Sequence, residues 1–274
     1  MQTSLGDIVA HPTRNQRNAF LAWTVVSLAV AQALVQFLPL LGLGAPVGVR
    51  ASVVRTPLTP AGWTFAIWGL IYLWSFAYAV HQVLPGQRND PLLASVRLPS
   101  ALVFALSGLW VVVAQFTGLG FGTVLIIVPL LILLLVVLFN IQPDARDLSG
   151  RQRILLHWPF LLYAGWVSLA TFANISSFLA FIDVSLFGLG QTGAAALLLL
   201  CAGAFCIAVE RLLGGSLVYV LPVLWGLAGI AVANVQRGPD YWFAAYAVAM
   251  AGALAGFTLW TRKRLTRKVN RRRG

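Results

Sequence analysis

The sequence predicts an all-α fold, a polytopic membrane helix bundle of about eight transmembrane helices. Three observations support this prediction. Hydrophobic residues make up 59% of the 274 positions and charged residues only 9%, whereas about 25% of the residues of a soluble domain are charged. Uncharged apolar runs of about twenty residues recur along the chain, and each is long enough to cross a hydrocarbon core of about 30 Å. Charged residues, glycines or prolines separate these runs, as helix ends and loops require.

The first four predicted helices cover residues 20–43, 60–83, 98–116 and 121–140. The first follows Arg17 and ends before Gly44, and the second begins at Pro60 and ends before Pro85. The charge-free stretch that follows Arg97 is too long for one helix. We therefore divide it at the three residues 118–120, Gly-Leu-Gly, which gives the third and fourth helices.

The last four predicted helices cover residues 154–182, 191–209, 216–233 and 241–260. The fifth follows Arg153, and its length predicts a tilted helix or an interfacial beginning near His157. The sixth ends before Glu210-Arg211, which we interpret as a loop boundary, and the seventh follows the glycine pair 214–215. The eighth ends where a basic tail begins.

The distribution of basic residues predicts that both termini are cytoplasmic, because Lys and Arg are retained on that side of the membrane. With eight spans, the cytoplasmic segments hold Arg14, Arg17, Arg88, Arg97, Arg146, Arg151, Arg153, Arg211 and the basic residues that follow Trp260. The opposite side holds Arg50, Arg55 and Arg237. This topology accounts for the net charge of +12, so we expect no nucleic-acid partner, and we expect the tail at 262–274 to contact membrane lipids. The preference for Arg over Lys, with abundant Ala, Leu and Gly, is typical of a GC-rich bacterium and favours its plasma membrane.

The acidic residues lie in predicted loops or at helix ends, which gives no evidence of an ion-coupled transporter or a pump. Such proteins usually keep a carboxylate or another ionisable group inside the bundle as a relay. No His, Cys or carboxylate cluster has the spacing of metal ligands, and no acid and base pair is available for catalysis. We therefore expect no catalytic residue, no metal site and no covalently bound cofactor. The acidic residues are Asp7, Asp90, Asp144, Asp147, Asp183, Glu210 and Asp240.

Aromatic side chains share faces of three predicted helices, together with small or neutral polar residues. On the second helix, Phe65, Trp68, Tyr72 and Phe76 lie on one face. The fifth helix places Tyr163, Trp166, Ala170 and Asn174 on one face, and the third adds Ser107 and Trp110. An Asn at membrane depth is costly unless it is hydrogen-bonded, so Asn174 should point into the bundle.

Packing or membrane anchoring is the alternative role for these rings. Tryptophan is enriched at both membrane interfaces, which accounts for Trp63, Trp158, Trp242 and Trp260 without any ligand. For Trp68, Trp110 and Trp166, packing alone and pocket lining remain open. The glycines of the GALAG sequence, Gly252 and Gly256, indicate close helix packing, either within the chain or in a homodimer.

Three motifs resemble the TspO/MBR family, the tryptophan-rich sensory proteins related to the mitochondrial translocator protein. The stretch TPAGWTFAIWGLIYL at 59–73 resembles the second-helix signature of that family. SGLW at 107–110 resembles its third-helix Asn-x-x-Trp pattern, with Ser107 in the Asn position, and WVSLATFAN at 166–174 resembles its fifth-helix segment. The resemblance covers about residues 18–182. It divides the chain into a TspO-like five-helix core at 1–182, a three-helix C-terminal extension at 183–261 and the basic tail at 262–274.

The resemblance implies a five-helix bundle around a cavity that binds porphyrins and other flat apolar molecules under a lid formed by residues 44–59. It also implies a sensor or carrier of such a ligand. Two alternatives remain: a membrane enzyme that degrades or modifies a porphyrin by using tryptophan, and a structural or chaperone-like membrane partner. The extension is expected to add a wall, a dimer interface or a second function. The residues expected to bind the ligand are Phe65, Trp68, Tyr72, Trp110, Tyr163, Trp166, Ala170 and Asn174.

Overall fold

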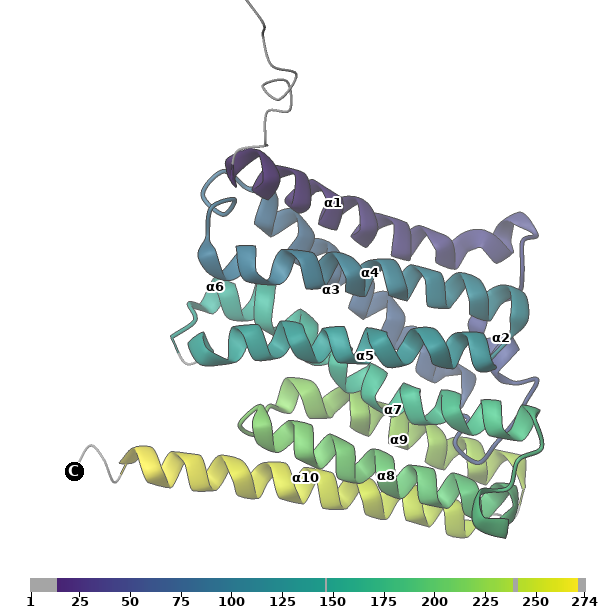
Figure 1. Ribbon diagram of the computed structural model, residues 1–274. Helices are drawn as coiled ribbons and strands as arrows, with labels where there is room; N and C mark the ends of the chain where they lie inside the picture. The colour runs from purple at the N-terminus through teal and green to yellow at the C-terminus, as the bar shows by residue number, and fades with distance from the viewer. Residues whose placement is uncertain (1–13, 146, 239–240, 271–274) are drawn as a thin grey trace, which may run out of the picture.

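The computed structural model describes residues 14–145, 147–238 and 241–270. The expectations for Asp7, Arg146, Asp240 and the end of the basic tail therefore lie outside the described residues. Figure 1 shows a bundle of long, roughly parallel and antiparallel helices. In chain order the helices are α1 (Arg14–Leu34), η2 (Val35–Leu41), α2 (Val47–Ala51), η3 (Gly62–Ala66), α3 (Ile67–Val83), α4 (Pro91–Thr117), α5 (Phe121–Ile141), η4 (Gln142–Asp144), α6 (Gly150–Gln152), η5 (Arg153–His157), α7 (Trp158–Phe181), η6 (Leu186–Gly188), α8 (Gly190–Leu212), α9 (Leu217–Arg237) and α10 (Tyr241–Asn270).

The all-α membrane bundle predicted from the sequence is confirmed. Within the described residues, eight helical stretches are long and apolar enough to cross a membrane, one for each predicted span. The break between the third and fourth spans also lies where it was predicted. Helix α4 ends at Thr117, Gly118 adopts a positive φ of 81°, and α5 begins at Phe121.

The third span begins earlier than the sequence analysis predicted, at Pro91 instead of residue 98. The Asp90 carboxylate caps the helix by accepting bonds from the backbone nitrogens of Leu92 and Leu93, at 2.8 and 3.1 Å, and proline is favoured at the first helical position. Arg97 is therefore a fully buried residue within α4 and not part of a cytoplasmic loop. Its guanidinium donates to Gln82 Oε1 at 3.2 Å and to the carbonyl of Gln87 at 2.9 Å, which compensates for part of its desolvation.

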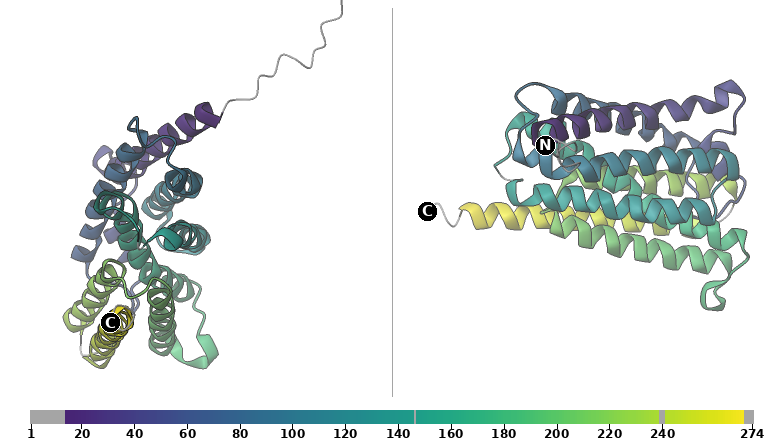
Figure 2. Two further views of the ribbon diagram at one scale, coloured as in Figure 1. Left: turned by 90° about the vertical axis from the view of Figure 1, so that its left-hand side faces the viewer. Right: turned by 45° about the horizontal axis from the view of Figure 1, so that its top comes forward.

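Helix α7 lies at the centre of the bundle. It contacts α3, α5, α8 and α9, and in the end-on view of Figure 2 the other helices are arranged around it. In the apolar part of its span, 72% of the residues are buried inside the protein. The corresponding share for the span that contains α1 is 17%. Helix α7 is thus the main element through which α8 and α9 join the first four spans, and α9 also contacts η3, while α10 packs on α8 and α9.

Glycines allow α9 to approach the rest of the bundle closely. A side chain at Gly165 of α7 would strike the backbone carbonyl of Tyr219 in α9. On α9, a Cβ at Gly226 would lie 2.5 Å from Leu169 Cδ2, and one at Gly229 would strike the Thr64 side chain. Helix α9 is therefore packed tightly against α7 and against Thr64 of η3.

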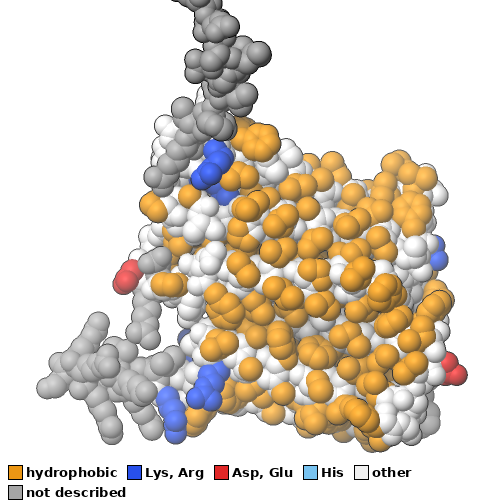
Figure 3. Space-filling view, viewed as in Figure 1, with side chains coloured by type: hydrophobic (Ala, Val, Ile, Leu, Met, Phe, Trp, Pro, Cys, Tyr) orange, Lys and Arg blue, Asp and Glu red, His pale blue; other side chains and the backbone are white. Residues whose placement is uncertain are grey.

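The surface has the character expected for a protein embedded in a bilayer. Figure 3 shows a broad hydrophobic band across the visible face, with most of its Lys and Arg side chains at one end. The beginning of α1 and the end of α10 lie at that same end (Figure 1). Gly252 and Gly256 are exposed on α10, and an added Cβ at either would meet no atom within 4 Å. Their role is therefore not close packing within the described chain, and the homodimer stays a prediction.

Candidate functional site

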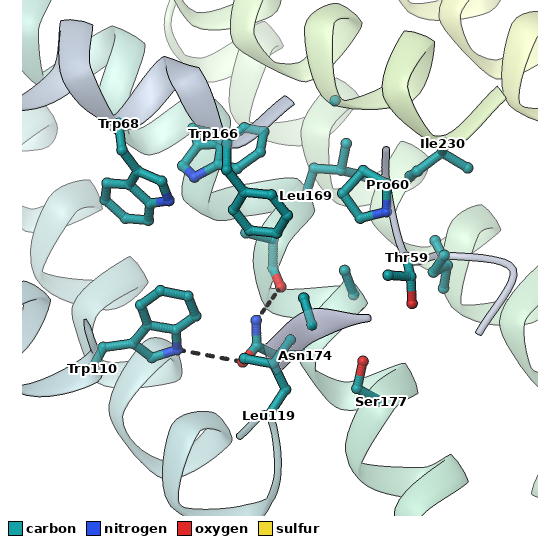
Figure 4. Close-up of a pocket in the computed structure, with 16 residues that line it drawn as sticks. Thr59, Pro60, Trp68, Trp110, Leu119, Trp166, Leu169, Asn174, Ser177 and Ile230 are labelled. Carbon is teal, nitrogen blue, oxygen red and sulfur yellow. Dashed lines mark hydrogen bonds between the residues drawn. The ribbon is translucent and has the colours of Figure 1, made fainter. Parts of the chain in front are cut away.

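A cavity of about 40 Å³ lies where α3, α4, α7 and α9 meet the segment before η3. Figure 4 shows Trp68 and Trp110 on one side of it and Thr59, Pro60 and Ile230 on the other. None of its lining side chains is ionisable. We call it the aromatic cavity. It is lined by Ala51, Leu58, Thr59, Pro60, Phe65, Trp68, Trp110, Leu119, Trp166, Leu169, Ala170, Ala173, Asn174, Ser177, Gly226 and Ile230.

The structure places six of the eight residues predicted to bind the ligand on the wall of this cavity, namely Phe65, Trp68, Trp110, Trp166, Ala170 and Asn174. The other two, Tyr72 and Tyr163, are buried behind Trp68. Tyr72 stacks on the Trp68 ring with the ring centroids 5.3 Å apart, and Tyr163 meets it edge-on at 5.7 Å. These two tyrosines support the cavity wall without lining it.

Trp68 is the centre of the aromatic cluster. Its ring stacks on Trp110 with the centroids 5.8 Å apart and the planes 27° from parallel, and it meets Trp166 edge-on at 6.3 Å. A flat molecule inserted between two rings needs about 7 Å between them, twice the carbon contact distance of about 3.5 Å. A planar ligand can therefore enter between Trp68 and Trp110 only if these rings move apart.

Asn174 points into the bundle, as predicted, and its amide is hydrogen-bonded. It accepts a bond from the indole nitrogen of Trp110 at 3.3 Å and donates to the carbonyl of Ala170 at 3.0 Å, as the dashed lines in Figure 4 show. The first of these bonds joins α7 to α4 and fixes the orientation of the Trp110 ring against the cavity.

The segment predicted as a lid forms one wall of the cavity. Its residues Ala51, Leu58 and Thr59 line the cavity together with Pro60, which follows it. The beginning of the segment is attached to α4, because the carbonyl of Gln115 accepts bonds from the backbone of Ala45 at 3.0 Å and from Arg50 Nε at 2.9 Å.

Helix α9 supplies part of the site that the sequence analysis did not identify. Gly226 and Ile230 line the cavity, so of the three roles left open for the extension, α9 provides a wall. It also holds the lid segment in place: the backbone nitrogen of Ala61 donates to the carbonyl of Gly229 at 3.0 Å, and Asn234 Nδ2 donates to the carbonyl of Pro57 at 2.8 Å. In the sequence, the features of α9 that indicate such a close contact are Asn234, Gly226 and Gly229, because polar and small residues in membrane helices are typical of helix interfaces.

Glu210, interpreted from the sequence as a loop boundary, is in fact buried in the last turn of α8. Neither carboxylate oxygen has a hydrogen-bond partner within the described part of the chain. Glu210 does not line the aromatic cavity, so its burial supplies no acid or base to that site.

Buried polar atoms without partners lie near the cluster. Both amide atoms of Gln32, Ser107 Oγ, the Tyr163 hydroxyl and the indole nitrogen of Trp166 form no hydrogen bond with the described residues. Gln36, one helical turn after Gln32, instead donates to the Tyr72 hydroxyl at 2.7 Å. The Gln36 amide therefore has a hydrogen-bond partner in Tyr72, whereas the Gln32 amide has none among the described residues.

We expect the substitution Gln32→Leu to raise the free energy of unfolding by about 1 kcal/mol, because it removes a buried amide that lacks partners. Gln36→Leu is the matched control, and it should lower the free energy of unfolding by about 1 kcal/mol because it removes a hydrogen bond to Tyr72. Thermal unfolding of both variants in the same detergent measures the difference. A loss of stability for Gln32→Leu as large as that for Gln36→Leu would mean that the Gln32 amide has bonding partners in solution.

Comparison with known families gives one match. A family model described as TSPO-like protein matches residues 18–260. The match extends beyond the residues 18–182 that carry the sequence resemblance, and it includes the last three membrane spans. No curated protein and no solved structure matches the chain.

Proposed function

The chain belongs to the family of TSPO-like proteins, and we propose that it binds a flat apolar small molecule of the porphyrin or tetrapyrrole type in the aromatic cavity. It acts as a sensor or carrier of this ligand. The observation that carries the proposal is the cluster of Phe65, Trp68, Trp110 and Trp166 on the wall of a cavity without ionisable lining residues. Indole and phenyl faces stack on planar apolar rings, and such pockets are typical of small-molecule sites.

The size of the cavity implies that the protein opens to bind this ligand. A volume of about 40 Å³ holds only a few water molecules, whereas sites for drug-sized ligands have about 300–1,000 Å³. The wall formed by Leu58, Thr59 and Pro60 belongs to a connecting segment and not to a long helix. Movement of this segment, together with separation of the Trp68 and Trp110 rings, enlarges the cavity at the lowest cost in helix packing.

We also propose the bacterial plasma membrane as the location, with both termini cytoplasmic. The beginning of α1 and the end of α10 lie at the same end of the bundle, and most of the basic side chains on the face shown in Figure 3 gather there. Lys and Arg are enriched on the cytoplasmic side of membrane proteins. A cysteine-accessibility assay on Lys263→Cys, an exposed position of α10, in intact cells and with the exposed Cys201 replaced by Ser, tests this orientation.

Quenching of tryptophan fluorescence by protoporphyrin IX tests the proposed function. We expect saturable quenching by the purified protein, and we expect the affinity to fall by about 2–10-fold in Trp68→Phe and in Trp166→Phe, because each variant loses indole contact with the ligand. Trp23→Phe is the matched control, since Trp23 is an exposed residue of α1 and does not line the cavity. Unchanged affinity in both cavity variants would contradict the proposal and would favour a structural role for the rings.

The enzyme alternative is tested in the same samples. A protein that modifies the porphyrin through tryptophan should form product under light, and the product should disappear when Trp68 and Trp166 are both replaced by Phe. Product formation that persists in this double variant would exclude the tryptophan mechanism. Saturable binding without product would support the sensor or carrier role.

A further inference from the structure

A second cavity lies at the end of the bundle where α9 finishes, and it is basic. Its volume is about 270 Å³, and it is lined by Arg55 and Thr56 of the lid segment and by Asn234 and Arg237 of α9, among other residues. No acidic side chain of the described residues lines it. We call it the basic cavity.

The two arginines of the basic cavity keep unused hydrogen-bonding capacity. A guanidinium has five N–H donors. Arg55 is bonded through Nε, which donates to the carbonyl of Ser52 at 2.9 Å. Arg237 donates to the carbonyls of Thr56 and Pro60, at 3.4 and 3.3 Å, which are long for N–H···O bonds.

Arg55 and Arg237 are also close enough to interact electrostatically. Neither forms an ion pair with a carboxylate among the residues that the structure describes. Two neighbouring cations repel each other, and an anion bound between them removes this repulsion and accepts charge-assisted bonds. The basic cavity is therefore suited to a carboxylate or phosphate group.

A single turn separates the basic cavity from the aromatic cavity. Thr56 lines the basic cavity and Thr59 lines the aromatic one. The two threonines bond to each other: the backbone nitrogen of Thr56 donates to Thr59 Oγ1 at 3.0 Å, and the backbone nitrogen of Thr59 donates to the Thr56 carbonyl at 3.0 Å. Three residues of chain span at most about 10 Å, so one molecule of moderate size can reach both cavities.

We propose that the two cavities form one site for an amphipathic anion, with its flat apolar part among the indole rings and its carboxylate between Arg55 and Arg237. This inference rests on the proposed function and defines its ligand class. A carboxylate is a stronger acceptor for a guanidinium than a neutral carbonyl is. The ligand therefore competes with the carbonyls of Thr56 and Pro60 for Arg237, and this competition weakens one of the contacts that hold the lid segment to α9.

The experiment compares protoporphyrin IX, which carries carboxylates, with its neutral dimethyl ester in phosphatidylcholine nanodiscs. Tryptophan quenching is titrated for the unmodified protein, for Arg55→Gln, for Arg237→Gln and for the double variant. We expect the unmodified protein to bind the acid about tenfold more tightly than the ester, because a charge-assisted pair is lost in the ester. The double variant should bind both probes with the ester affinity of the unmodified protein, which also shows that it is folded. Arg211→Gln is the control, because Arg211 is an exposed cation at the end of α8 that lines neither cavity, and this variant should keep the preference.

Four outcomes would overturn this inference. Equal binding of acid and ester by the unmodified protein, or a preference that survives in the double variant, would remove the anion site while leaving the proposed function intact. Phosphatidylglycerol could abolish the preference of the unmodified protein for the acid while leaving binding by the double variant unchanged. That result would assign the basic cavity to a lipid headgroup. If neither probe quenches saturably, the proposed function itself fails, and the inference fails with it.

Discussion

Replacing Trp68 by alanine is expected to lower the free energy of unfolding by about 3–5 kcal/mol, the usual cost of truncating a buried tryptophan. The Trp68 ring contacts four others, from Tyr72, Trp110, Tyr163 and Trp166, with centroid distances from 5.3 to 6.3 Å. The neighbouring rings are held on three helices and cannot collapse fully into the vacated space. Thermal unfolding in detergent should show a fall in Tm of about 6–20 °C, at about 2–4 °C per kcal/mol.

The same variant should recover stability when indole is added. The substitution leaves an apolar space with the shape of the lost side chain, and such spaces bind small aromatic molecules. Indole that binds the folded protein raises Tm, and the rise grows with the indole concentration. At about 100 times the dissociation constant, binding adds about 2.7 kcal/mol to the free energy of unfolding. Trp23→Ala, which truncates an exposed ring on α1, is the control and should neither lose much stability nor respond to indole. An equal response of both variants would show that indole acts on the detergent and not on the cavity.

The membrane spans could be predicted because each depends on a local property of the sequence. An apolar run of sufficient length forms a helix in a bilayer, and Gly118 and Gly120 mark the break in the longest run. The beginning of α4 was predicted wrongly because Arg97 was interpreted as a helix boundary. The acceptors that allow Arg97 to be buried, Gln82 Oε1 and the carbonyl of Gln87, belong to the end of α3 and the loop after it, and only the tertiary structure brings them together.

The periodicity of the aromatic residues predicted a common face for Trp68 and Tyr72, which are both buried, but Phe76, predicted on the same face, is exposed. The periodicity also did not show which of these rings reach the cavity. Tyr72 follows Trp68 by one helical turn, so both lie on one face of α3, but Tyr72 is behind Trp68 as seen from the cavity. The contribution of α9 depends on pairing with distant residues. Gly229 contacts the segment before η3 because Ala61 donates to its carbonyl and Thr64 packs on it, and the sequence of α9 alone does not identify these partners.

Gly165→Ala should disrupt the contact between α7 and α9. The added Cβ would strike the Tyr219 carbonyl and would lie 2.6 Å from Pro222 Cγ. A backbone carbonyl and a proline ring cannot turn away as a flexible side chain does, so α9 must shift from α7, at a cost of about 1–3 kcal/mol. We expect Tm to fall by about 2–12 °C. The affinity for protoporphyrin IX should also fall, because the shift of α9 displaces Gly226 and Ile230 from the wall of the aromatic cavity.

The control Gly69→Ala separates this effect from the general consequences of replacing a helical glycine. Gly69 is exposed in α3, and an added Cβ would meet no atom within 4 Å. Alanine there should stabilise the helix by up to about 1 kcal/mol. If Gly165→Ala proved as stable as Gly69→Ala and bound the porphyrin equally well, α7 and α9 would not be in close contact. The conclusions that α9 forms a wall of the aromatic cavity and that it binds the lid segment would then be wrong. The ligand site would be confined to the first five spans.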